Sequence, residues 1–277
     1  MNATITLNAL HADADTTNAY GGKTTDRFNT VRARWDALTA TDQADTITPV
    51  VDLLTGDTDP TPADLALTLA LADLHSLTAK QPVLRAENRS LIAARLLPMQ
   101  RAEWNTTLAD NYTNAAKAYT TAAGHLIAAL DLIGDHTEDT VLTAPTKTRE
   151  AWLRLPTLRD HVDHAADALA FFAHANNIDA GPANLGLYAA IPNTADRRTV
   201  WAAIDGDHGP AGLWGTLHAL GATLTAPNAD SVRSYRRPKP IETRYIRRDL
   251  GWAPVDYDPE TDQPKGAVPA GGTNVAA

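Results

Sequence analysis

Cysteine is entirely absent from the chain. Disulfide bonds, thiolate nucleophiles and thiolate metal ligands are therefore excluded, and the composition suits the cytoplasm or a virion better than a secreted setting. The N-terminal sequence has no basic start and no long apolar run, so we expect no secretory signal peptide. No stretch reaches the roughly 18 apolar residues that a membrane helix needs, so the sequence predicts a soluble protein.

Aromatic residues and serine are also scarce. Aromatics make up 6% of the chain against 44% hydrophobic residues, so alanine and leucine must supply most of the core. Alanine has the highest helix propensity, which makes the composition favour helices. None of the four serines lies in a G-x-S-x-G turn, so the sequence offers no sign of a nucleophilic hydrolase.

Apolar residues recur at helical spacing along most of the chain. The strongest pattern runs from Met99 to Ile133, where positions three and four apart form one apolar stripe and predict a single long amphipathic helix. Further helices are expected near 26–38, 42–54, 61–80 and 158–176, and shorter ones after Gly181. We therefore predict an all-α fold, an irregular helical bundle around one long central helix, with extended N- and C-terminal arms.

The pattern of apolar, charged and proline residues divides the chain into three parts. Residues 1–23 are predicted to be an N-terminal arm, in which the alternation in ATITL could form a short strand. Residues 24–225 form the helical body, with a sub-boundary near 177–193. Residues 226–277 form a tail that is rich in proline and charge and begins basic. Its last stretch, roughly Tyr257–Ala277, is expected to be disordered unless a partner orders it.

Two motifs resemble nucleotide or calcium loops without completing them. GGKT at Gly21–Thr24 has the end of a P-loop, but Thr17 stands where the first glycine should be. Acidic residues alternate from Asp256 to Asp262 as in a calcium loop, yet the glycine and glutamate that such a loop requires are missing. We interpret the first as a turn before a helix and the second as a consequence of an aspartate-rich composition.

Histidines give the only candidate metal ligands. His161 and His164 lie on one predicted helix beside carboxylates, and His125 on the long helix could add a third imidazole. One helix rarely supplies enough ligands, so a solvated face with Asp–His pairs is favoured over a metal centre. No cofactor is predicted.

Positive charge gathers near the end of an otherwise acidic chain. Residues 231–277 carry eight Lys and Arg against six Asp and Glu, whereas residues 1–230 carry 16 against 27. Within 233–252, arginine far outnumbers lysine and alternates with aromatic residues. Candidate partner contacts are Arg233, Tyr235, Arg236, Arg237, Arg244, Tyr245, Arg247, Arg248 and Trp252.

Three interpretations of this segment compete. It could bind nucleic acid, with arginines on phosphates and aromatics on bases, although the acidic body would oppose approach. It could dock on an acidic protein surface, either a partner or a second copy, because arginine and aromatics are enriched at interface cores. It could also fold back on its own acidic body.

The second interpretation is the one the sequence favours. It predicts a non-enzymatic helical interaction or assembly protein, a subunit or scaffold of a larger complex such as a phage or virion particle. A nucleic-acid-binding protein that uses the same segment is the first alternative. A metal-dependent enzyme built on the three histidines is the second.

Overall fold

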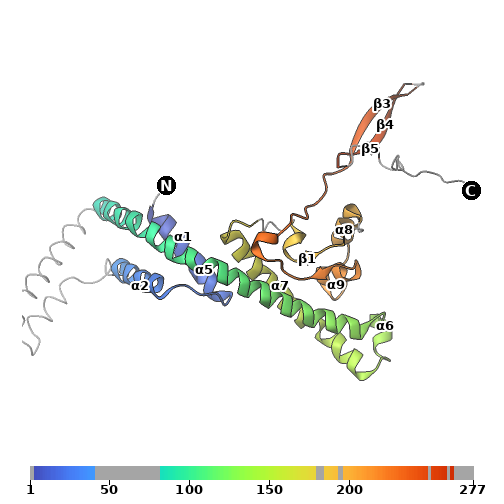
Figure 1. The fold of residues 1–277 in the computed structure, drawn as a ribbon, viewed down its shortest axis with the longest axis horizontal. Coiled ribbons are helices and arrows are strands. Elements are labelled where there is room, and N and C mark those ends of the chain that lie inside the picture. The colour runs from blue at the N-terminus through green and yellow to red at the C-terminus, as the bar shows by residue number, and fades with distance from the viewer. Residues whose placement is uncertain are drawn as a thin grey trace, which may run out of the picture. The chain divides into compact units, whose positions relative to one another are not determined.

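The structure is a computed structural model that describes residues 3–40, 82–178, 184–192, 196–248, 251–260 and 263–264 (Figure 1). This part of the chain is mostly helical and also holds two small sheets, which confirms the all-α prediction in its coarse form. Two compact units are present: Met1–Lys117 with Phe171–Asn177, and Ala118–Ala170 with Ile178–Ala277. The domain boundaries predicted after residues 23 and 225 stay predictions.

The N-terminal segment is a helix, not an extended arm. Helix α1 (Ala3–Ala19) includes the ATITL stretch, so the short strand that its alternation allowed does not form. The alternation in ATITL spans too few residues to decide the structure. Leu7, Leu10, Ala14 and Thr17 are buried at intervals of three and four, and this helical period places them on one face of α1.

The first unit packs α1 and helix α2 (Asp26–Ala40) with the N-terminal part of the long helix α5 (Pro82–Ile133). The backbone N–H of Phe28 donates to the Thr25 hydroxyl at 3.0 Å, a hydrogen bond that caps the start of α2. The main apolar cluster of this unit joins all three helices through Leu10, Ala14, Phe28, Trp104 and Leu108.

The GGKT turn joins α1 to α2 and is held by one buried side chain. Asn111 on α5 accepts from the Lys23 backbone N–H and donates to the Lys23 carbonyl, both at 2.9 Å. The Asn111 side-chain amide thus forms the same two hydrogen bonds with Lys23 that a neighbouring backbone residue would form in an antiparallel sheet. The turn follows a helix, so the strand that a P-loop needs before its glycines is not there.

The long helix confirms the strongest sequence pattern. Helix α5 contains the whole stretch from Met99 to Ile133, with Pro98 inside it and Gly134 after it at a φ of 56°. The predicted stripe is largely buried, at Trp104, Leu108, Tyr112, Ala115, Tyr119, Leu126 and Ile133. The helix expected near 158–176 also exists but begins at Thr146, as α7 (Thr146–Ala175). The helices expected at 42–54 and 61–80 lie outside the described residues.

The second unit contains the remaining short elements. These are α6 (Glu138–Val141), η2 (Leu185–Leu187), α8 (Arg197–Ile204), α9 (Gly212–Ala219) and η3 (Ala229–Ser231). A small sheet pairs β1 (Ala189–Ala190) with β2 (Thr223–Leu224), and a second sheet has the order β3-β4-β5. In the core of the second unit, the rings of Tyr119, Tyr188 and Trp214 pack with their centroids 5.5–5.9 Å apart.

Gly124 in α5 gives a direct test of the helix. It is exposed, its φ is not positive, and a Cβ there would meet no atom within 4 Å. Gly124→Ala should therefore stabilise the protein by about 0.5–1 kcal/mol, because alanine loses less backbone entropy in a helix. Urea unfolding followed by circular dichroism measures this gain. An unchanged or lower midpoint would contradict a regular helix at this position.

In the described ranges, no helix is long and apolar enough to cross a membrane.

Candidate binding site in the C-terminal segment

An extended segment, residues 232–241, follows η3 and lies against η2; we call it the strap. Asn184 is almost fully buried, and its side-chain oxygen binds both the strap and η2. This oxygen accepts from the backbone N–H of Tyr235 at 2.8 Å and of Gly186 at 3.1 Å. The Leu185 N–H also donates to the Tyr235 carbonyl at 3.3 Å. The strap is thereby fixed to the rest of its unit by backbone hydrogen bonds.

Arg237 in the strap has an acidic partner of its own. Its guanidinium donates to both carboxylate oxygens of Asp205, at 2.6 and 2.7 Å, and lies 4.8 Å from the centre of the Trp201 ring. These hydrogen bonds hold the pKa of Asp205 below its ordinary value. A bidentate arginine–carboxylate pair beside an aromatic face is among the more specific ion-pair geometries.

Four charged residues tie the end of the second sheet to the start of α8; we call them the clasp. Arg198 donates to Asp258, with 2.7 Å between Nε and Oδ2, and Arg197 pairs with Glu260. Glu260 also accepts from the backbone N–H of Lys239 at 3.0 Å. Hydrogen bonds from Arg198 lower the pKa of Asp258 to about 2. Asp258 and Glu260 are thus bound to arginines instead of to a calcium ion.

The clasp should respond to acid in a defined window. A carboxylate whose pKa is lowered by folding stabilises the fold above its unfolded pKa and loses this effect as the pH falls through the folded pKa. For Asp258 that window runs from its ordinary 3.8 down to about 2. In carboxyl-carbon NMR, Arg198→Gln should move the Asp258 midpoint up toward 3.8. A wild-type midpoint already near the ordinary value would contradict the ion pair.

Strands β3 (Glu242–Arg248) and β4 (Gly251–Asp258) form an antiparallel hairpin, and β5 (Gln263–Pro264) pairs with the end of β4. Directly opposed residues share a face of a sheet. The register opposes Arg247 to Trp252, Tyr245 to Pro254 and Thr243 to Asp256, so these six residues lie on one face, which we call the open face. Tyr245 and Trp252 are 66% and 71% exposed.

On the other face of the hairpin, Arg244 makes its contacts with residues of the hairpin itself. Arg244 stacks over the Tyr257 ring at 3.5 Å and pairs with Glu242 at 3.1 Å. Because the guanidinium of Arg244 already contacts the Tyr257 ring and the Glu242 carboxylate, it is less available to a partner than Arg247 is. The two faces therefore differ, because only the open face presents large aromatic rings to solvent.

No protein-family model matches the chain, and neither a curated protein nor a solved structure matches it.

The structure divides the nine predicted contact residues into groups. Tyr245, Arg247 and Trp252 come together on the open face. Tyr235 and Arg237 instead bind their own unit, Arg236 donates to Ser234 at 2.9 Å, and Arg244 faces the opposite side of the hairpin. Arg233 borders a cavity, and the structure does not describe the side chain of Arg248.

Sequence reasoning missed the residues that receive the strap. Asn184, Gly186 and Asp205 lie some 30–50 positions before their strap partners. No local pattern marks such pairs, although the excess of acidic residues in 1–230 indicated that arginine partners exist.

The three candidate metal ligands do not form a centre in the described part of the chain. His125, His161 and His164 are all exposed. No group of three or more histidine, aspartate or glutamate side chains among the described residues could hold a metal ion. The structure therefore gives these histidines no shared site.

Proposed function

We propose that this chain is a non-enzymatic interaction protein that docks on an acidic protein surface through the open face of its hairpin. The observation that carries the proposal is the exposure of Tyr245 and Trp252 on the same face as Arg247. Large aromatics exposed side by side are unusual on a soluble surface and are typical of residues that a partner buries.

The charges near the open face favour a protein over a polyanion. Arg197, Arg198, Arg237 and Arg244 are already paired with carboxylates of the same unit. Arg247 has no ion-pair partner among the described residues, lies opposite Trp252 in the register and is two positions from Tyr245 along β3. Nucleic-acid affinity grows with the number of phosphates neutralised, so the single arginine of the open face supplies little of it. Arginine, tyrosine and tryptophan together have the composition of a protein interface hot spot.

The partner is proposed to be acidic, and a second copy of the chain satisfies that condition. Residues 1–230 carry an excess of 11 acidic groups. A carboxylate that pairs with Arg247 in a desolvated interface would form a bidentate contact, and apolar groups beside it would cover the two rings. An assembly role, as a subunit or scaffold, follows if the docking joins identical or repeated subunits.

Fluorescence anisotropy with full-length protein tests the proposal. The probe is a labelled peptide of alternating glutamate and leucine, which offers carboxylates to Arg247 and apolar side chains to the rings. Trp252→Ala and Arg247→Gln should each weaken binding by about 30-fold, the effect of losing a hot-spot residue. Arg34→Gln, at an exposed arginine of α2, makes the same charge change elsewhere and should leave binding unchanged.

Parallel measurements separate the competing partners. Self-association in sedimentation velocity that Trp252→Ala abolishes would identify a second copy as the acidic partner and support the proposal. Binding of a labelled oligo(dT) in preference to the peptide, lost in the same variants, would assign the open face to single-stranded nucleic acid instead. If the wild-type protein stays monomeric and binds neither probe at low salt, the open face is not a docking surface.

A further inference from the structure

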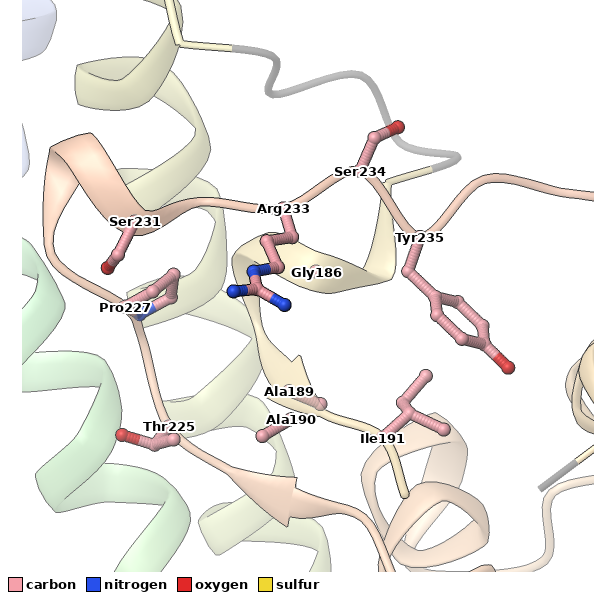
Figure 2. A pocket seen from close by; sticks show the side chains of 10 residues that line it. All are labelled: Gly186, Ala189, Ala190, Ile191, Thr225, Pro227, Ser231, Arg233, Ser234 and Tyr235. Carbon is pink, nitrogen blue, oxygen red and sulfur yellow. The ribbon is translucent and has the colours of Figure 1, made fainter. Parts of the chain in front are cut away.

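A cavity of about 410 Å³ lies between the strap and the β1–β2 sheet. Figure 2 shows the side chains that surround it: Gly186, Ala189, Ala190, Ile191, Thr225, Pro227, Ser231, Arg233, Ser234 and Tyr235. Its volume falls in the range of small-molecule sites, which enclose about 300–1,000 Å³. Its walls combine alanine, isoleucine and proline side chains with a few hydroxyl groups. Such a lining suits a small ligand with an apolar body and one polar group.

Arg233 supplies the only charged side chain of this lining. In Figure 2 its guanidinium extends from the strap toward β1 and Pro227. No described residue forms a hydrogen bond or ion pair with it, in contrast to Arg237, which binds Asp205 at 2.6 Å four positions later. A guanidinium presents a planar fork of donors that matches the two oxygens of a carboxylate. This exposed guanidinium at the border of the cavity is therefore available to a carboxylate.

The strap is positioned before any ligand binds. Asn184 fixes Tyr235 and Gly186 on one side of the cavity, and the backbone carbonyl of Arg233 lies directly over Gly186, where a Cβ would collide with it. The Asp205–Arg237 pair holds the strap farther along. A ligand would therefore meet Arg233 on a backbone that is already fixed, which lowers the ordering cost of binding.

We propose that this cavity binds a small carboxylic acid, with its carboxylate on the Arg233 guanidinium and a compact apolar group against Ala190, Ile191 and Pro227. One cation and an apolar wall fit a monoanion better than a phosphate dianion, which usually requires several charged or backbone donors. Thr225 and Ser231 add hydroxyl groups at the border of the cavity. This site is separate from the open face and does not depend on the function proposed for it.

Saturation-transfer NMR on the full-length protein tests the site with a matched pair of probes. Isovalerate carries the carboxylate on a branched apolar group, and isovaleramide has nearly the same shape without the charge. We expect isovalerate to bind with a dissociation constant of about 1 mM, in keeping with a ligand of few atoms. Isovaleramide should bind at least about tenfold more weakly, because it cannot form the charged fork with Arg233. N-acetylvaline and its amide form a second pair, which distinguishes a chain terminus from a free acid.

Substitution and hydrogen exchange complete the test. Arg233→Gln should reduce isovalerate affinity at least about tenfold, and Arg34→Gln should not. Bound isovalerate should also slow amide exchange in the strap, because a ligand that binds only the docked strap stabilises it. If Arg233→Gln also releases the strap, the comparison of isovalerate with isovaleramide on the wild-type protein still shows whether the site recognises a carboxylate. Equal binding of acid and amide, or no saturation transfer to either acid, would overturn the proposal.

Discussion

Gly186→Ala should detach the strap from its unit while leaving the helices folded. A Cβ at Gly186 would collide with the backbone carbonyl of Arg233, and a backbone group cannot rotate away as a side chain can. The strap must then shift, which breaks the hydrogen bonds of Tyr235 with Asn184 and Leu185. Overpacking and two lost hydrogen bonds together cost about 2–4 kcal/mol of local stability.

Hydrogen exchange with mass spectrometry measures this release. Exchange in peptides that cover 233–237 should speed up by about 30-fold or more, the change that 2 kcal/mol produces. Gly206→Ala is the matched control, since a Cβ there meets its nearest atom at 3.4 Å and needs no movement of the strap. Unchanged protection at 233–237 in Gly186→Ala would mean that the strap does not lie on η2.

Asn111→Leu should destabilise the first unit more than any exposed polar substitution on α5. The leucine removes the amide that binds both backbone groups of Lys23 and leaves them without their protein partner. The cost should be about 2–3 kcal/mol, because a lost partner for a partly buried backbone group carries its desolvation penalty. Denaturant unfolding measures the total, and hydrogen exchange at 20–25 shows whether the GGKT turn opens first.

An exposed asparagine on the same helix provides the control. Asn114→Leu makes the same replacement at an exposed position of α5 and should change stability by less than about 0.5 kcal/mol. If both variants lose the same stability, the effect belongs to leucine on this helix and not to the hydrogen bonds of Asn111.

Helices were predictable where apolar residues repeat over several turns. Trp104, Leu108, Tyr112 and Ala115 recur on one face over a long stretch, so chance does not produce the pattern, and all four are buried. The start of α7 was missed because Ala151 and Leu155, both buried, are followed by Pro156 inside the helix. A proline usually indicates a boundary, yet tertiary packing overrides that local preference here.

The hairpin was not predicted, and its sequence explains why. Strand β3 is mostly charged, with only Thr243, Tyr245 and Ile246 uncharged, so its sequence shows no apolar face. Strand β4 contains Pro254, and a proline is usually evidence against a strand. The pairing of β3 with β4 depends on residues that lie opposite each other across the hairpin, and the spacing of residues along one strand does not show which these are. The candidate contacts were therefore identified by residue type, whereas the choice of Tyr245, Arg247 and Trp252 among them required the register.

The clasp also has a consequence for the helix that it meets. Helix α8 opens with Arg197 and Arg198 and has no acidic residue in its first turn after the N-cap Asp196. Cations there oppose the positive end of the helix dipole. Asp258 and Glu260 bring the missing negative charge to that end from some 60 residues later. Residues at and just after the end of β4 thus add to the stability of the first turn of α8, and a protein cut before Asp258 would lose that contribution.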